Sequence, residues 1–198
     1  MRIEIAPPTD PWVFFAEWFE IAKQHETIYP DAMVIATVGE GMCLSTRTVL
    51  MKSFDERGIV FHTNRLSRKG EHLSIVGSGA CTFLWKSLMR QVHMEGKIEK
   101  ITDEESDSYF ATRLRGSQIG AWASLQSKPL ESRAELEGRV RLYEEQFAGG
   151  DVPRPEHWGG YRLIPSRIEF WSEQPYRLHD RILYVRIEDD WTMERLYP

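Results

Sequence analysis

The chain has 198 residues, 41% of them hydrophobic and 12% aromatic, with 25 Lys and Arg residues against 30 Asp and Glu residues. This length suits one domain with a buried core, and the aromatic content excludes a disordered chain. The formal net charge of −5 argues against non-specific binding to nucleic acid or to an anionic membrane.

The cysteines and the N-terminus indicate a soluble protein of the reducing cytoplasm. Cys43 and Cys81 are too few for a disulfide scaffold or a structural zinc site, and we expect no metal. The first ten residues, with charges at Arg2 and Glu4, lack the apolar segment of a secretory signal. No apolar run approaches the ~18 residues that a membrane-spanning helix needs.

The first third of the chain predicts one helix, then three strands and a second helix. Asp10 followed by Pro11 is a typical helix start, and the apolar residues after it repeat at helical spacing. These residues are Phe15, Trp18, Phe19 and Ala22. Runs rich in aliphatic and β-branched residues predict strands over 33–38, 44–52 and 59–61, before a short helix over 67–75.

The rest of the chain predicts further strands with helices between them. Residues 80–85 and 91–101 form an expected hairpin, whose second arm alternates apolar and polar residues. Thr102 and Glu105 form a capping box that begins a helix, and residues 131–147 predict an amphipathic helix. Four more strands are expected over 160–164, 166–171, 181–187 and 191–196. Strands without regular β-α-β alternation favour a mainly β fold, an antiparallel sheet or barrel decorated by helices.

Basic residues in the middle of the chain are candidates for binding an anion. The segment from Arg47 to Arg115 has 12 Lys and Arg residues against 9 Asp and Glu, an excess that suits a buried anionic small molecule or arises by chance. Arg47 and Lys52 are five residues apart on an expected strand, which places them on opposite faces unless a bulge intervenes. Arg68 and Lys69 lie at an expected helix start, which favours a phosphate or is only a solvated cap.

Three polar residues in the next helical region share a spacing of four. Tyr109, Arg113 and Ser117 point the same way if the helix continues through them. An Arg between two hydroxyl groups suits a phosphate clamp. The alternative is a helix surface with incidental polarity.

A dense polar cluster lies near the C-terminus. Arg177, His179 and Arg181 fall within five residues, shortly after Trp171. The sequence contains no Ser-His-Asp order, no HExxH, no Walker loop and no GxGxxG. Chemistry by a protein nucleophile or a metal is therefore disfavoured, and a cofactor is the natural alternative.

Several strings, in order along the chain, resemble the pyridoxamine 5′-phosphate oxidases. They are RTVLMK (47–52), FHTN (61–64), SRKG (67–70), RQVHMEG (90–96), YFATRLRGSQIGAWASLQS (109–127), WGGYRLIP (158–165), IEFW (168–171), RLHDR (177–181) and the terminal RL-x-P. Each string alone is weak evidence, but the ordered set is specific and runs from about residue 10 to residue 198.

This resemblance implies a single FMN-binding split β-barrel domain over residues 1–198, with residues 1–9 as a flexible N-terminal arm. It implies FMN bound at a homodimer interface. It also implies oxidation of pyridoxine or pyridoxamine 5′-phosphate to pyridoxal 5′-phosphate, with O2 as electron acceptor and H2O2 as by-product. The alternatives are a split-barrel flavin enzyme with another substrate and a non-catalytic protein that binds FMN or pyridoxal phosphate.

The resemblance assigns residues to both ligands. For FMN they are Arg47, Thr48, Val49, Leu50, Met51, Lys52, His62, Thr63, Arg68, Lys69, Gln91, Gln126, Ser127, Trp171 and Arg181. For the substrate they are Lys52, Tyr109, Arg113, Ser117, Arg177, Leu178 and His179. Arg177 and His179 are expected over the pyridine ring as catalytic residues. On an extended segment both point one way, and Leu178 points toward the core.

The chain departs from the family pattern in places. His62 stands where Tyr is usual, Cys43-Leu44 replaces a Pro-containing turn, and Val76-Gly77 stands where Asn-Pro is common. The N-terminal arm is also short. These departures bear on closure over the substrate and on its affinity rather than on the fold.

Overall fold

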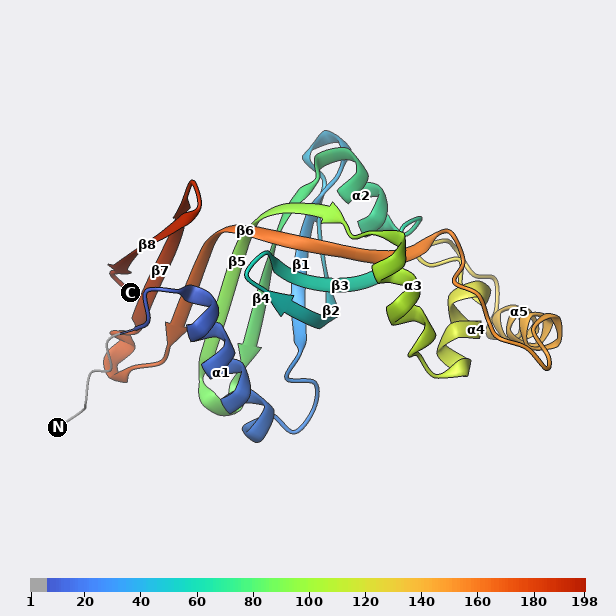
Figure 1. Ribbon diagram of the computed structural model, residues 1–198, viewed down its shortest axis with the longest axis horizontal. Coiled ribbons are helices and arrows are strands. Elements are labelled where there is room, and N and C mark those ends of the chain that lie inside the picture. Colours follow the sequence, from blue (N-terminus) through green and yellow to red (C-terminus); the bar gives the residue numbers. More distant parts are fainter. Residues whose placement is uncertain (1–6) are drawn as a thin grey trace.

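Six antiparallel strands close into a barrel in the computed structural model, which describes residues 7–198 (Figure 1). They are β1 (Ala32–Val38), β2 (Leu44–Asp55), β3 (Gly58–Asn64), β4 (Ser78–Trp85), β5 (Arg90–Lys100) and β6 (Trp158–Ser172). Their order is β3-β2-β1-β4-β5-β6, and β3 also pairs with β6. Strands β7 (Asp180–Ile187) and β8 (Asp190–Leu196) extend the sheet beyond β6. The antiparallel barrel expected from the sequence is confirmed, while most of the expected N-terminal arm lies outside the described residues.

Five helices decorate the barrel in the described part of the chain. They are α1 (Pro11–His25), α2 (Arg68–Val76), α3 (Asp103–Ala111), α4 (Arg115–Ala123) and α5 (Arg133–Gln146), with short 3₁₀ turns η1 (Glu40–Met42), η2 (Lys86–Leu88) and η3 (Pro175–Arg177). Asp10 caps α1, and Thr102 with Glu105 forms the predicted capping box of α3. Figure 1 shows α3, α4 and α5 gathered at one end of the molecule, with β7 and β8 at the other. Within residues 7–198, no helix is long and apolar enough to cross a membrane.

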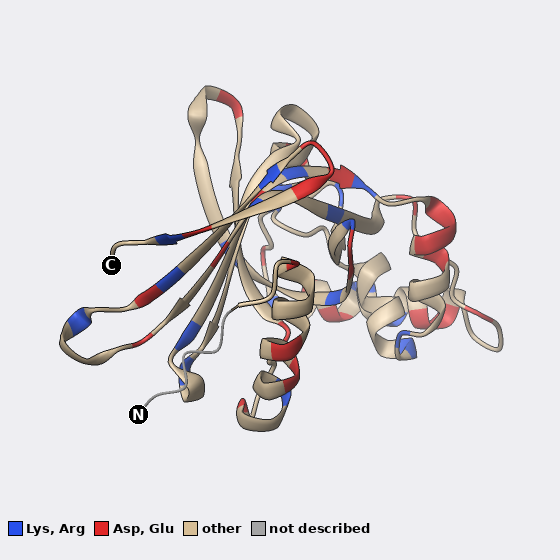
Figure 2. Ribbon diagram, turned by 60° about the vertical axis from the view of Figure 1, so that its left-hand side comes forward, with Lys and Arg blue, Asp and Glu red and all other residues tan. Residues whose placement is uncertain are grey.

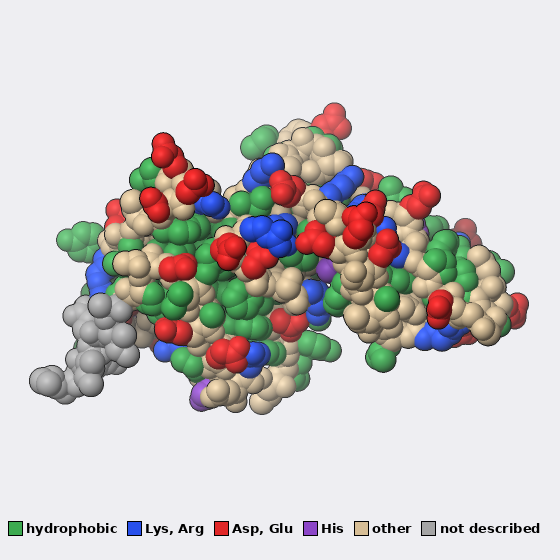
Figure 3. All heavy atoms as spheres, viewed as in Figure 1, with side chains coloured by type: hydrophobic (Ala, Val, Ile, Leu, Met, Phe, Trp, Pro, Cys, Tyr) green, Lys and Arg blue, Asp and Glu red, His purple; other side chains and the backbone are tan. Residues whose placement is uncertain are grey.

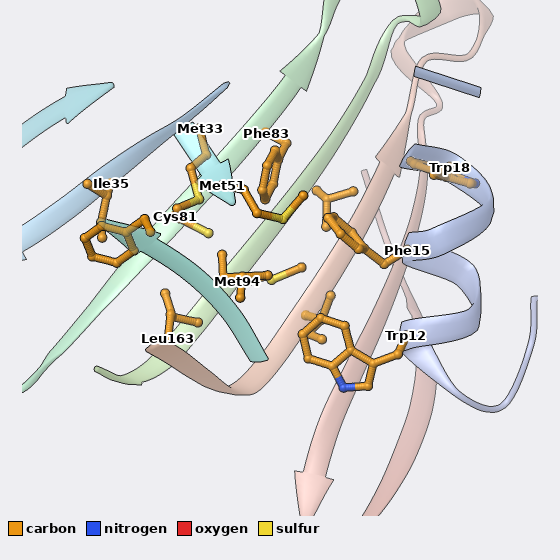
Figure 4. Close-up of a cluster of buried hydrophobic side chains, with 14 of the residues drawn as sticks. Trp12, Phe15, Trp18, Met33, Ile35, Met51, Cys81, Phe83, Met94 and Leu163 are labelled. Carbon is orange, nitrogen blue, oxygen red and sulfur yellow. The ribbon is translucent and has the colours of Figure 1, made fainter. Parts of the chain in front are cut away.

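Two hydrophobic clusters support this arrangement. The larger one fills the barrel, where α1 contributes the fully buried side chain of Phe15 (Figure 4). Burying one such aromatic side chain contributes about 1.5–3 kcal/mol to folding. The smaller cluster joins Phe110 of α3 and Ile119 of α4 to Trp158 of β6. Helices α3 and α4 are therefore held against the barrel. A cavity lies between these two helices and the barrel.

Strand β6 differs from the expectation of two separate strands over 160–164 and 166–171. It is continuous for 15 residues, pairing with β3 through its first half and with β7 through its second. The expected break is instead a register shift in the β5–β6 pairing, where Gly96 lies opposite Pro165. A Cβ added to Gly96 would lie 2.0 Å from the Ile164 carbonyl oxygen, so only glycine permits this close approach.

Charge is distributed differently on the surface and in the interior. Figure 2 shows many of the acidic residues on helices, and α3 carries three of them in its first turn. On the face drawn in Figure 3, acidic and basic side chains are interspersed without an extended patch of one sign. Four Lys and Arg residues of the middle segment line a cavity between the barrel and helices α3 and α4.

Candidate active site

A cavity of about 620 Å³ brings together strands β2 and β3 with helices α2, α3 and α4. Twelve of the residues predicted from the sequence line it: Arg47, Thr48, Val49, Leu50, Lys52, His62, Thr63, Lys69, Tyr109, Arg113, Ser117 and Gln126. Four of these twelve are Lys or Arg, and none of the described lining residues is Asp or Glu. Cations without carboxylates, in a chain of net charge −5, suit an anionic ligand.

Strand β2 has a bulge at Lys52, and Lys52 lines the same cavity as Arg47. In the β2–β3 pairing, Met51 lies opposite Phe61 and Ser53 lies opposite Val60, so Lys52 is an extra residue without a partner. A bulge interrupts the regular alternation of side chains and re-aims one of them. The bulge that the sequence left open is therefore present, and Arg47 and Lys52 both line the cavity. Lys52 also forms an ion pair with Asp31 at 3.2 Å.

Lys69 is held at the start of α2 by three oxygen atoms. Its Nζ donates to Gln126 Oε1 at 2.6 Å, to Thr63 Oγ1 at 2.9 Å and to Ser67 Oγ at 3.1 Å. Ser67 is also the N-cap of α2 and accepts from the Gly70 N–H. Burial, with a smaller effect of the Arg47 charge, lowers the pKa of Lys69 to about 8. The helix start thus presents a buried cation beside free backbone N–H groups, an arrangement that favours a phosphate.

The residues Tyr109, Arg113 and Ser117 converge on the cavity, but not on one continuous helix. Helix α3 ends at Ala111 and α4 begins at Arg115, so the helix does not continue through all three residues, the condition on which their common direction rested. Thr112 Oγ1 donates to the Tyr109 carbonyl oxygen, a local bond that competes with helical hydrogen bonding. The break changes the direction of the chain, and all three side chains still line the same cavity.

His62 forms a cluster of three rings with Tyr109 and Trp158 at the cavity wall. Its ring centroid is 4.2 Å from that of Tyr109 and 5.1 Å from that of Trp158, and both ring pairs are stacked. The Arg113 guanidinium lies 4.7 Å from the Trp158 ring centroid. Burial first, and then the positive charge of Arg113, lower the pKa of His62 to about 4. Within residues 7–198, the two His62 ring nitrogens and Arg113 Nη1 are buried without a hydrogen-bond partner.

The C-terminal candidates lie in two other hollows. Arg177 and His179 line a hollow of about 680 Å³ that also contains Trp171, whereas Gln91 and Trp171 line a hollow of about 400 Å³. The segment 177–179 is not extended as expected, because Arg177, at the end of η3, adopts a left-handed backbone conformation with φ 63°. Leu178 is 66% exposed rather than directed into the core, since the turn reverses the chain at this point.

The remaining candidates have separate environments. Met51 is buried in the barrel core, and Arg68 Nη2 donates to Cys43 Sγ at 3.2 Å. Ser127 follows Gln126 at a positive φ of 73°, and Arg181 forms an ion pair with Glu169 at 2.7 Å. None of these four residues is among the described residues that line the cavity of about 620 Å³, the main cavity.

Family models match almost the whole chain. The model described as pyridoxamine 5′-phosphate oxidase matches residues 21–147, and the pyridoxine 5′-phosphate oxidase C-terminal dimerisation region matches residues 158–198. The chain belongs to the pyridoxamine 5′-phosphate oxidase family.

Curated relatives in this family are similar over their whole length. A pyridoxine/pyridoxamine 5′-phosphate oxidase of Myxococcus xanthus is 53% identical over 191 residues, covering 96% of this chain and 93% of the relative. One of Brucella canis is 49% identical, covering 96% of this chain and 94% of the relative. The predicted family membership is confirmed, and the chain is an enzyme of the oxidoreductase class.

Solved structures confirm the split-barrel fold. PhzG of Burkholderia lata, in complex with tetrahydrophenazine-1-carboxylic acid, has a TM-score of 0.91 and 29% identity over 99% of each chain. A pyridoxamine 5′-phosphate oxidase-related, FMN-binding protein of Nostoc punctiforme has a TM-score of 0.76. It covers 98% of this chain and 100% of its own, and at 15% identity it supports the fold alone.

Five further residues line the main cavity of this pyridoxamine 5′-phosphate oxidase family member without having been predicted as site residues. They are Asn64, Gly120, Ala121, Ser124 and Trp158. All five fall inside the strings that carry the family resemblance, so the signal for them was present. Trp158 in particular stacks on His62. The two residues are 96 positions apart, so no local pattern in the sequence could predict this contact.

Proposed function

We propose that the chain is an FMN-dependent oxidase that converts pyridoxine or pyridoxamine 5′-phosphate to pyridoxal 5′-phosphate, with O2 as electron acceptor and H2O2 as by-product. The observation that carries the proposal is the cavity of four cations without a carboxylate among its described lining residues. It belongs to a chain whose curated relatives at 49–53% identity are named for this activity. Both proposed ligands carry a phosphate, which Lys and Arg bind through charge-assisted hydrogen bonds.

The donors of the cavity fit these two phosphorylated ligands. Arg47 and Lys69 would bind the FMN phosphate, beside the N–H groups at the start of α2. Arg113, with Lys52, Tyr109 and Ser117, would bind the substrate phosphate. The unpartnered Arg113 Nη1 supports this assignment, because a buried donor is costly until an acceptor satisfies it. The other FMN and substrate residues expected from the sequence remain predictions.

Bound FMN would supply the acceptor for a hydride removed from C4′ of the substrate. The chain itself positions the substrate and stabilises charge. The planar guanidinium of Arg177 would stabilise negative charge on the oxygen substituent of the pyridine ring. The Gln174 N–H donates to His179 Nδ1 at 3.2 Å, so this nitrogen accepts and a neutral His179 ring carries its proton on Nε2. His179 would therefore present an N–H donor.

A homodimer would complete the site. The hollow of Arg177 and His179 is separate from the main cavity within one chain. Residues 158–198, which include this hollow, match a dimerisation region. We propose that the Arg177 hollow of one protomer faces the main cavity of its partner, so that the two chains share each active site.

The decisive experiment is incubation of the purified protein with FMN and pyridoxine 5′-phosphate in air, with detection of the aldehyde product. Formation of the aldehyde with equimolar H2O2 supports the proposal. A second candidate is a flavin oxidoreductase with another substrate, which the fold similarity to PhzG favours. That enzyme would bind FMN without forming the aldehyde from either B6 phosphate. A protein that binds neither FMN nor a B6 phosphate contradicts both candidates.

A further inference from the structure

A hydrogen-bond network behind Arg47 extends beyond the lining of the cavity. Arg47 Nη1 donates to Thr37 Oγ1 at 2.8 Å and to the Ile35 carbonyl oxygen at 3.3 Å. Arg47 lies opposite Ile35 in the β1–β2 register, and Thr37 is two residues further along the same face of β1. The neighbouring strand therefore supplies both acceptors, and neither belongs to the described cavity lining.

The Thr37 hydroxyl connects Arg47 to His72. Thr37 is 1% exposed and His72 is 7% exposed, so water does not readily replace their partners. A guanidinium group only donates, so Thr37 Oγ1 accepts from Arg47 and keeps its own proton for His72 Nδ1, 3.2 Å away. This assignment gives the Thr37 hydroxyl both a donor and an acceptor, and it leaves the ring proton of a neutral His72 on Nε2.

His72 also ties the network to the second cation of the cavity. It belongs to α2, one turn after Lys69, whose ammonium group is held by Thr63, Ser67 and Gln126. The His72 ring packs over Gly39, where an added Cβ would lie 2.6 Å from Nε2. The ring therefore has little freedom to move, and α2 and β2 are joined through Thr37.

Arg47 needs such support because other cations surround it. The positive charge of Arg68 acts on Arg47, and that of Arg47 acts on Lys69. Like charges repel, and a free Arg side chain has considerable rotamer entropy to lose on binding. An acceptor in the protein interior both offsets the repulsion and fixes the guanidinium before a ligand arrives.

We infer that Thr37 and His72 are positioning residues, which hold the Arg47 guanidinium toward a bound phosphate. This inference rests on the proposed function, in which the anion of the cavity is the FMN phosphate. Thr37 sets the direction of Arg47, and His72 fixes the Thr37 hydroxyl. Neither residue needs to touch the ligand.

The test compares Thr37→Val, which removes the hydroxyl at nearly constant shape, with Thr37→Ser, which keeps it. The dissociation constant for FMN is measured by fluorescence titration of the apoprotein. We expect a rise of about 3- to 10-fold for Thr37→Val, below the full effect of a hydrogen bond to a charged group. Thr37→Ser restores wild-type affinity. His72→Leu shows a smaller loss than Thr37→Val.

A double-mutant cycle separates positioning from general destabilisation. In an Arg47→Ala background, Thr37→Val should cause no further loss of FMN affinity, because its target is gone. The matched control is Thr82→Val, which removes another Thr–His contact, from Thr82 Oγ1 to His93 Nδ1 at 3.0 Å, outside the cavity lining. Once light scattering confirms an unchanged size, this variant should bind FMN like the wild type.

Two results overturn the inference: wild-type FMN affinity in Thr37→Val, or an equal loss in the Arg47→Ala background. A wild-type protein that does not bind FMN overturns the proposed function instead. In that case the rise in melting temperature on addition of inorganic phosphate is measured for the same variants. Inorganic phosphate is a suitable probe because it needs only the site that binds the anion. Equal phosphate-induced shifts in wild type and Thr37→Val then contradict the inference.

Discussion

The Lys69 ammonium group donates a hydrogen bond of 2.6 Å to the Gln126 side-chain oxygen, which lies 57 positions further along the chain. This contact joins the start of α2 to the loop after α4 and closes one wall of the cavity. Every acceptor that Lys69 has in the network is a neutral oxygen. Its charge is therefore available to an anionic ligand.

Lys69→Met should weaken FMN binding about 10- to 150-fold, since a hydrogen bond to a charged group contributes about 1.5–3 kcal/mol. FMN affinity of the wild type should also fall as the pH rises through about 8, where the Lys69 ammonium loses its proton. Fluorescence titration across pH 6.5–9.5 measures both effects. Lys128→Met is the control, because Lys128 is exposed and pairs with Glu71 on the surface. The same pH dependence in Lys69→Met and wild type would contradict the assignment.

Arg113→Ala should raise the KM for pyridoxine 5′-phosphate by about 10- to 150-fold while FMN binding changes little. The variant loses a half-buried guanidinium whose Nη1 has no hydrogen-bond partner among the described residues and would donate to the substrate phosphate. Arg115→Ala is a matched control, since Arg115 donates to the Phe147 and Gly150 carbonyl oxygens and affects stability instead. Unphosphorylated pyridoxine should be a poor substrate of the wild type. Comparable activity on both forms would refute the phosphate clamp.

Arg177→Lys should lower kcat and leave the FMN content unchanged. Lysine keeps the charge but loses the planar guanidinium that stacks on, or hydrogen-bonds to, a π-system. Steady-state kinetics and flavin absorbance of the purified variant measure the two quantities. A wild-type kcat with a lowered melting temperature would mean that Arg177 only stabilises η3, where it adopts a positive φ of 63°.

His62 should make the folded protein less stable as the pH falls from 6.5 toward about 4. Its pKa is lowered from 6.5 to about 4 by burial and by Arg113, so the unfolded chain binds a proton in this range and the folded chain does not. His62→Phe should therefore lose stability less steeply over this interval. Urea unfolding at several pH values measures the difference, and parallel curves for the two proteins would contradict it.

Leu84→Asp should produce a monomer with weaker FMN binding. Leu84 is 53% exposed and lines the hollow of Gln91 and Trp171. This hollow shares Trp171 with the Arg177 hollow, so we expect the homodimer to cover it as well. A charge buried there without a partner is costly. Leu142→Asp is the control, because Leu142 is similarly exposed at 57% but lies on α5. Light scattering should give twice 23.1 kDa for wild type and control; a monomeric wild type with FMN bound would contradict the shared site.

Local patterns in the sequence were sufficient for most of the elements. The apolar repeat after Asp10 predicted α1, and the capping box of Thr102 and Glu105 predicted the start of α3. Alternation predicted the β4–β5 hairpin. These predictions held because helix caps and side-chain periodicity depend on residues within one or two turns. The ordered strings also identified the family, and twelve of the residues that they implied line one cavity.

Tertiary contacts decided the geometry of the site. The bulge at Lys52 is defined by the pairing of β2 with β3, and the smaller cluster packs α3 and α4 on Trp158. The left-handed turn at Arg177 lies in a segment that was expected to be extended. The bulge and this packing arise from residues distant in the sequence, which no local pattern records. The sequence thus determined the elements and the chemistry they carry, whereas only packing between β1, β2 and α2 placed Thr37 and His72 behind Arg47.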